Sequence, residues 1–228
     1  MAYQMEEHLL HLDGKVLTTT RRRFWDMNDP WVEEYLSERV IGMLKRYGFE
    51  YMKIDYNDTI GMGCDGSESI GEGLRINVEK TYGFMEKIKR EIPGIVLENC
   101  ASGGHRLEPR FMASTSMASF SDAHECEEIP IIAANLHRAI LPRQSQIWAV
   151  IREQDAGKRI VYSIVSTFLG RLCLSGDVTR LTESQWEVID RGMEFYKKLR
   201  GERKFPSPEA LRPEVMKNAE ETRKYYGP

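Results

Sequence analysis

Three polar residues alternate along a short, β-rich run that begins at Phe49, and they could form one side of a catalytic site. Every second side chain of a β-strand points to the same face, so Lys53, Asp55 and Asn57 are expected to share a face. A lysine beside an aspartate favours the ionised carboxylate, which is the form that acts as a nucleophile. The alternative is a structural Lys–Asp pair on a solvated strand face, with Asn57 starting a turn.

A second polar segment follows the next strand-like run and contains two consecutive glycines. Gly103 and its neighbour would let the backbone approach a ligand closely, and exposed N–H groups and Ser102 could donate hydrogen bonds to it. Arg106 adds a rigid fork of donors. The alternative is a tight strand-to-helix turn with an exposed arginine, in which Cys100 is a small buried apolar residue.

Asp122 ends a third strand-like run, two strand–helix units after Asp55. Active sites of α/β barrels and open α/β sheets lie at the carboxyl ends of the strands, so Asp122 could face Asp55 across such a site. One carboxylate held ionised by a lysine and one free to carry a proton are the minimum equipment for retaining glycoside hydrolysis. Alternatively, Ser121 and Asp122 only cap the segment that follows.

A metal site is the other chemistry that this region suggests, because His124 and Glu125 follow Asp122 closely. No second histidine-rich cluster supports that interpretation, and His137 is expected on a helix. The four cysteines form no Cys-x-x-Cys pair, which disfavours a zinc knuckle and a disulfide framework. We therefore expect no metal.

Taken together, the three segments resemble one family, the melibiase-type α-galactosidases of glycoside hydrolase family 36. The resemblance rests on Lys-x-Asp-x-Asn, then Cys-x-x-Gly-x-x-Arg inside a Glu-Asn-Cys-Ala-Ser-Gly-Gly block, then Ser-Asp, in that order and spacing. It covers residues 20–200, and the Glu98–Gly104 block is its most specific part.

The resemblance implies a retaining glycoside hydrolase that removes terminal α-galactose from galacto-oligosaccharides by double displacement, without a metal or organic cofactor. It also implies a (β/α)₈ barrel with Asp55 as nucleophile on the fourth strand and Asp122 as acid/base on the sixth. The remaining matched positions would contact the galactose ring or the region of its 2-hydroxyl. They are Lys53 and Asn57 for the ring, and Cys100, Gly103 and Arg106 with the neighbouring Ser102 for the 2-hydroxyl.

The sequence departs from the family pattern at several points. Ile54 and Tyr56 stand where the family usually has Trp and Met, although Ile54 should face the outside of the barrel. The residues after Asp122, Ala-His-Glu-Cys-Glu-Glu, replace an Asp-Thr-Asp-Ala pattern, which leaves the leaving-group specificity open. Family members also have three earlier strands with a Trp and an Asp-Asp pair for the 4- and 6-hydroxyls, an N-terminal β-domain and a C-terminal β-sandwich, none of which has a counterpart here.

Helices and strands alternate along the chain, which predicts an α/β fold with parallel strands. The expected order is helix 29–48, strand 49–55, helix 75–92, strands 95–100 and 117–122, a mostly helical and irregular stretch 127–170, strand 168–174 and helix 182–200. Together with the resemblance, this order predicts a partial (β/α)₈ TIM-type barrel, about strands 4 to 8, over residues 1–200. A loosely packed C-terminal tail is expected over 201–228.

Local signals set the ends of several of these elements. Asp29 can cap the first helix and Gly48 can end it, with an apolar stripe that includes Val40 and Met43. Thr182 and Gln185 have the spacing of a capping box before the last helix. The glycine-rich loop 57–73 is long for a βα connection, so we expect it to be either functional or mobile.

The composition excludes several classes of protein. The 228 residues are 41% hydrophobic and 29% charged, which are ordinary globular values. A net charge of −3 gives no reason to expect a nucleic acid or an anionic membrane as partner. The longest apolar run is too short for a membrane span, and residues 1–12 do not resemble a signal peptide, so a cytoplasmic location is expected.

Two alternatives to hydrolysis by this chain remain open. Raffinose-synthase-like relatives transfer galactose to another sugar, and nothing in these residues distinguishes transfer from hydrolysis. The chain could also be a catalytically incomplete barrel that needs a partner chain, because half a barrel leaves two open sheet edges. We therefore expect either a homo-oligomer or pairing with a missing N-terminal barrel half, with an α-galactoside as the small-molecule partner.

Overall fold

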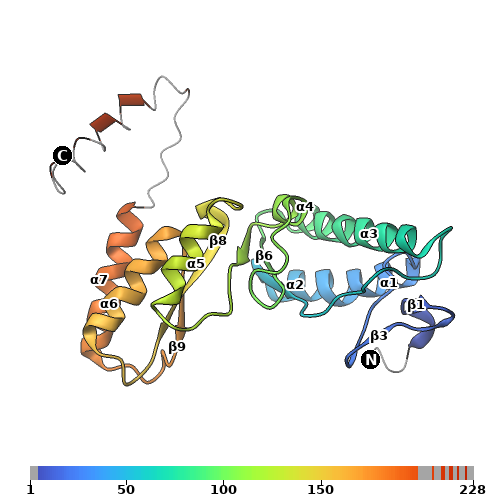
Figure 1. The fold of residues 1–228 in the computed structure, drawn as a ribbon, viewed down its shortest axis with the longest axis horizontal. Helices are drawn as coiled ribbons and strands as arrows, with labels where there is room; N and C mark the ends of the chain where they lie inside the picture. The colour runs from blue at the N-terminus through green and yellow to red at the C-terminus, as the bar shows by residue number, and fades with distance from the viewer. Residues whose placement is uncertain are drawn as a thin grey trace.

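The computed structural model describes residues 5–199 and, beyond them, Ser207, 212–213, 216–217, Glu220 and Lys224. Its centre is a parallel sheet of five strands whose spatial order follows the chain (Figure 1). The strands are β5 (Tyr51–Asp55), β6 (Val96–Cys100), β7 (Met117–Ser119), β8 (Ser145–Ile151) and β9 (Arg171–Gly176). Sequential parallel strands joined by helical crossovers are the pattern of a (β/α)₈ barrel, so the predicted partial barrel is confirmed.

The helices pack on one face of this sheet. One core lies where α2 and α3 (Ile70–Glu91) cover β5 and β6, and another lies where α6 (Gly157–Ser166) and α7 (Glu183–Leu199) cover β8 and β9. Two shorter helices, α4 (Pro109–Ser114) and α5 (Glu128–Leu136), complete the crossovers. We call the face opposite the helices the inner face, because it corresponds to the inside of a closed barrel.

The first helix begins and ends where the sequence predicts. It consists of α1 (Pro30–Leu36), a π-helical turn (Ser37–Ile41) and α2 (Gly42–Tyr47). Asp29 caps it by accepting the Trp31 N–H at 2.8 Å, and Gly48 ends it with φ 68°.

The buried face of this helix differs from the predicted stripe. A π-helical turn takes one extra residue, so it moves the buried side of the helix by one position. Ile41 is therefore buried, Val40 is only partly buried against the same core, and Met43 is 43% exposed.

Residues 127–170 were expected to be mostly helical and irregular, and that prediction is wrong at β8. Nearly all of the seven residues of β8 are buried, those on the inner face included. A strand that is covered on both faces has no polar–apolar alternation, so its period does not separate it from a buried helical segment. The sequence therefore identified four of the five strands.

The capping box predicted at the start of the last helix is confirmed. The Gln185 N–H donates to Thr182 Oγ1 at 3.3 Å, and the Thr182 N–H donates to Gln185 Oε1 at 2.9 Å. Ile189 on its buried side is completely inaccessible and packs against α6. The predicted tail at 201–228 lies almost wholly outside the described residues and stays a prediction.

Two small hairpins near the N-terminus hold the long loop after β5. They are β1 (His11–Leu12) with β2 (Lys15–Val16), and β3 (Thr18–Thr19) with β4 (Arg22–Arg23). The Asp65 N–H donates to the His11 carbonyl at 2.7 Å, and the Asp65 carboxylate accepts the Gly14 N–H at 2.8 Å. The loop is thus bonded to a separate part of the chain. Among the described residues, no helix is long and apolar enough to cross a membrane.

Candidate active site

Lys53 and Asp55 lie on the inner face of the sheet. Met52 and Ile54 pack against the helices, which turns the alternate residues of β5 to the opposite side. The predicted shared face of Lys53 and Asp55 is therefore confirmed. Asp55 is exposed at the carboxyl end of β5, where barrel enzymes carry their catalytic groups.

The Lys53 ammonium lies in a negative environment. Its Nζ is 3.6 Å from Glu98 Oε1, on the neighbouring strand. Partial burial lowers the pKa of Lys53, but Cys100, Glu98 and Asp55 outweigh that effect and raise the pKa above its usual value. The charged ammonium therefore lies two residues from Asp55 on the same face of the strand.

The loops after β5 and β6 meet beside this pair. Asn57 Oδ1 accepts the backbone N–H of Ser102 at 2.6 Å. Ser102 and Gly103 both have positive φ angles, 44° and 72°, so the chain turns sharply after β6. Asn57 and Ser102, two of the predicted substrate-binding residues, are therefore in direct contact.

Gly103 brings this turn against the segment that carries Asp122. A Cβ atom on Gly103 would lie 2.6 Å from the backbone nitrogen of Asp122 and 2.7 Å from the backbone of Ser121. The sequence predicts that this glycine lets a ligand approach, and the structure shows that it also lets neighbouring backbone come close. Bonds and contacts thus connect Asn57 to Ser102 and Gly103 to Asp122.

Asp122 lies beyond the strand that was expected to end with it. β7 stops at Ser119, and Asp122 follows in an irregular segment with its side chain exposed. Neither Asp55 nor Asp122 makes a hydrogen bond or ion pair with another residue that the structure describes. Both carboxylates are free to meet a substrate.

Trp148 on β8 connects the two sides of the inner face. Lys53 Nζ lies 5.7 Å from the centre of its ring, and the His124 ring lies 5.5 Å from it. Lys53 neighbours Asp55 and His124 neighbours Asp122, so Trp148 lies between the two candidate catalytic segments. Sequence reasoning missed Trp148 because it missed β8.

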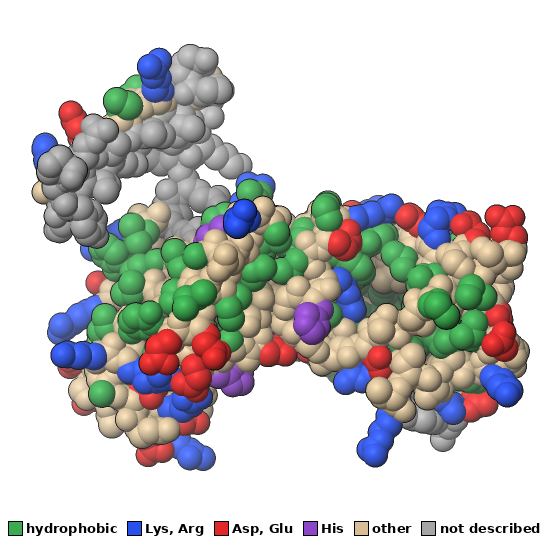
Figure 2. Space-filling model, viewed as in Figure 1, with side chains coloured by type: hydrophobic (Ala, Val, Ile, Leu, Met, Phe, Trp, Pro, Cys, Tyr) green, Lys and Arg blue, Asp and Glu red, His purple; other side chains and the backbone are tan. Residues whose placement is uncertain are grey.

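Arg106 points to a different region. Its Nη2 donates to the Tyr56 carbonyl at 3.0 Å, and its guanidinium lies 5.1 Å from the centre of the Phe111 ring. It lines a cavity of 730 Å³ on the helix side of β5, which Figure 2 shows as a hollow bordered by hydrophobic side chains. Burial lowers the pKa of Arg106. Asp55 and Asp122 do not line this cavity, although the charge of Asp55 acts on the Arg106 guanidinium.

Comparisons with known proteins agree with this geometry. The Melibiase family model matches residues 2–205. The chain belongs to the melibiase family. Its curated relatives include alpha-galactosidase AgaA of Geobacillus stearothermophilus, which is 25% identical over 73% of the chain and 24% of that protein. Alpha-galactosidase 2 of Pediococcus pentosaceus is 23% identical over 50% of the chain and 16% of that protein.

Solved structures of alpha-galactosidases share the melibiase-family fold of this chain. The GH36 enzyme AgaA of G. stearothermophilus matches with a TM-score of 0.76 and 19% identity over 87% of the chain and 29% of that structure. An alpha-galactosidase of Lactobacillus brevis matches with a TM-score of 0.74 and 21% identity, over 87% of the chain and 28% of that structure. The chain thus spans about a quarter of the length of these relatives.

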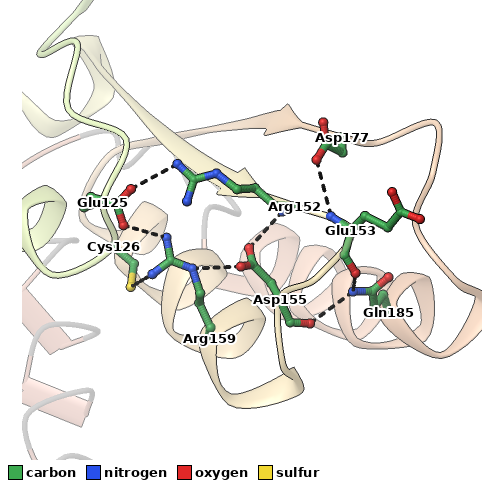
Figure 3. Close-up of polar contacts among 8 residues, drawn as sticks. All are labelled: Glu125, Cys126, Arg152, Glu153, Asp155, Arg159, Asp177 and Gln185. Carbon is green, nitrogen blue, oxygen red and sulfur yellow. Dashed lines mark hydrogen bonds and ion pairs between the residues drawn. The ribbon is translucent and has the colours of Figure 1, made fainter.

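The segment in which this chain departs from the melibiase pattern is bonded to two arginines (Figure 3). Glu125 accepts from Arg152 Nη2 and from Arg159 Nη2, at 3.0 Å each, and these bonds lower the pKa of its carboxyl. Asp155 accepts from Arg159 Nε at 3.0 Å and from the Arg152 N–H at 2.8 Å. Glu125 therefore ties the segment that carries Asp122 to β8 and α6.

The same bonds bear on the metal interpretation of His124 and Glu125. Both oxygens of Glu125 bind arginines, and Cys126 Sγ accepts from Arg159 Nη1 at 3.0 Å. Within residues 5–199 and the isolated positions after them, no group of three His, Cys, Asp or Glu side chains is placed to hold a metal ion.

Proposed function

We propose that this chain forms the half-barrel of a retaining glycoside hydrolase that carries the nucleophile and the acid/base, and that removes terminal α-galactose from galacto-oligosaccharides. The main support is the exposed carboxylate of Asp55 at the carboxyl end of β5, on the same face as the charged Lys53. Family membership supports the substrate class, because structures of AgaA variants contain raffinose or stachyose. The chain spans a quarter of such proteins, so its own activity is a proposal.

The proposed mechanism has two displacements. Asp55 attacks the anomeric carbon while Asp122 gives its proton to the leaving oxygen, which forms a galactosyl ester on Asp55. Asp122 then takes a proton from water, the water oxygen attacks the anomeric carbon, and the Asp55 carboxylate leaves. Lys53 places a positive charge beside the Asp55 carboxylate before it attacks and again as it leaves. These steps need no metal or organic cofactor.

The other predicted site residues belong to the same proposal. Asn57, Ser102 and Gly103 would shape the rim of the sugar site, since the contacts between them join the two loops. Cys100 is buried next to Lys53 and would contact the buried side of its ammonium group. A role for Arg106 in binding the 2-hydroxyl stays a prediction from the resemblance.

We further propose that the sheet is completed by other strands. A closed barrel of this type has eight strands, and β5 and β9 are the edges of the five described here. Open sheet edges favour association, either with a second copy or with a separate N-terminal barrel half. Size-exclusion chromatography tests this, because a well-behaved monomer contradicts it. The cytoplasmic location predicted from the sequence belongs to the same proposal.

The activity is tested with p-nitrophenyl α-galactoside. Asp55→Asn should abolish turnover, and azide should restore it to Asp55→Gly by replacing the missing nucleophile. Asp190→Asn, an exposed change on α7, is the matched control and should leave turnover intact. Retention predicts that the first product is the α-anomer of galactose, and release of the β-anomer would contradict the mechanism. Galactosylated sucrose or a new oligosaccharide in place of free galactose would identify a transferase.

A further inference from the structure

Glu98 is a buried carboxylate that the proposed double displacement does not use. It lies in the middle of the inner face, and its side chain is 1% exposed. Three neighbouring strands surround it with donors: the Tyr51 hydroxyl from β5, the Ser119 hydroxyl from β7, and Gln146 Nε2 from β8 at 2.9 Å. Burying a carboxylate is unfavourable unless it is paired and hydrogen-bonded, so this arrangement needs a reason.

The surroundings of Glu98 fit an ionised carboxylate. Gln146 Nε2 and the Lys53 ammonium can only donate, and the Tyr51 and Ser119 hydroxyls can donate as well. Burial and the bond to Glu98 raise the pKa of Tyr51, so the Tyr51 hydroxyl keeps its proton. The Lys53 ammonium, 3.6 Å away, completes the set with a positive charge.

Lys53 joins this network to the candidate nucleophile. In the register of β5 and β6, Lys53 lies opposite Glu98, and Asp55 lies opposite Cys100. The Lys53 ammonium is therefore paired with the buried Glu98 carboxylate and is also attracted by the exposed Asp55 carboxylate.

We propose that Glu98 is a positioning residue for the nucleophile: it holds the Lys53 ammonium beside the Asp55 carboxylate. Glu98 is too deeply buried to touch a substrate. The catalytic part of this inference rests on the proposed function. The ion pair between Glu98 and Lys53 depends only on the structure of the sheet, so it can be tested in a chain that has no activity.

Several groups face Lys53, and among those that raise its pKa Cys100 has the largest effect and Glu98 the next. They are Asp55 on β5, Glu98 and Cys100 on β6, the Trp148 ring on β8 and Cys173 on β9. Burial raises the pKa of Cys173, so it remains a neutral thiol. Glu98 alone among the described residues forms an ion pair with Lys53. Removing its charge should lower the pKa of Lys53 by about 1, which is a tenfold change in acidity.

The experiment measures the titration of Lys53 by NMR in the 228-residue chain labelled with ¹³C-lysine, with Lys53→Arg to assign the signal. In the unchanged chain, the pKa of Lys53 should lie above the ordinary value for a lysine side chain. Glu98→Gln keeps the shape of the side chain and should lower the pKa of Lys53 by about 1. The matched control is Glu91→Gln, which removes a carboxylate from the surface pair with Lys45 and should leave Lys53 unchanged.

Two results would overturn the inference: an ordinary pKa for Lys53 in the unchanged chain, or no change in Glu98→Gln. The first needs no variant, so the test stands even if Glu98→Gln does not fold. A chain without turnover whose Lys53 titrates as expected would overturn the proposed function and support the hold of Glu98 on Lys53.

Discussion

Replacing Gly103 by alanine should separate the turn after β6 from the segment that carries Asp122. Gly103 has φ 72°, a conformation that costs an alanine about 1 kcal/mol. The added Cβ would also lie 2.6 Å from the Asp122 nitrogen, whereas about 3.5 Å is the ordinary separation, so the two backbones must move apart by about 1 Å. Forcing an extra methyl group into a packed site costs about 1–3 kcal/mol. Together we expect a loss of about 2–4 kcal/mol in the free energy of unfolding.

Gly48→Ala separates the two contributions to this loss. Gly48 has nearly the same backbone angle, φ 68°, but a Cβ there would meet nothing within 4 Å. It should therefore cost about 1 kcal/mol, from the backbone conformation alone. Urea unfolding of both variants gives the two free energies, and the difference of about 1–3 kcal/mol is the part due to crowding against Asp122.

Hydrogen exchange locates the effect in the chain. In Gly103→Ala, amide exchange should rise at Ser121 and Asp122, and the same amides should be unaffected in Gly48→Ala. Equal destabilisation of the two variants, with no change of exchange at Asp122, would refute the argument that Gly103 positions this segment.

Two other consequences of the structure can be measured directly. Arg152 and Arg159 lower the pKa of Glu125, so their bonds to Glu125 stabilise the fold fully above pH 4.5, and this stabilisation is lost as the pH falls through the lowered pKa. The Tm difference between the unchanged chain and Glu125→Gln should therefore shrink as the pH falls below 4.5, and a constant difference would contradict this. Ile189→Ala should cost about 2–5 kcal/mol in urea unfolding because Ile189 is completely buried, while Leu199→Ala, at a position that is 56% exposed, should cost less than about 0.5 kcal/mol.

Local signals predicted several features correctly because their physical causes are local. Asp29 and Gly48 bound the first helix through bonds and backbone angles that involve only their neighbours along the chain. The common face of Lys53 and Asp55 follows from the period of a strand. The predicted stripe of the first helix is wrong at Met43, which is 43% exposed. The π-helical turn adds Ile41 to the buried side and leaves no mark in the pattern of apolar residues.

Burial on both faces of the sheet explains the main omission. β8 is covered on the helix side by α5 and α6 and is buried on the inner face as well, so its residues do not alternate in polarity. With β8 missing from the prediction, Gln146 and Trp148 could not be placed beside Lys53. Glu98 was seen only as part of a family motif, since a buried acid is recognised by its partners and not by its own neighbours in the sequence.

The sequence by itself determined the residue types at the strand ends, the alternation that places Lys53 and Asp55 on one face, and membership of an α/β class. The tertiary structure decided which of these residues meet. Glu98 finds Tyr51, Ser119 and Gln146 on three other strands, and these partners are between 21 and 48 positions away. Such contacts depend on strand order and register, which arise from packing of the whole sheet and not from any local pattern.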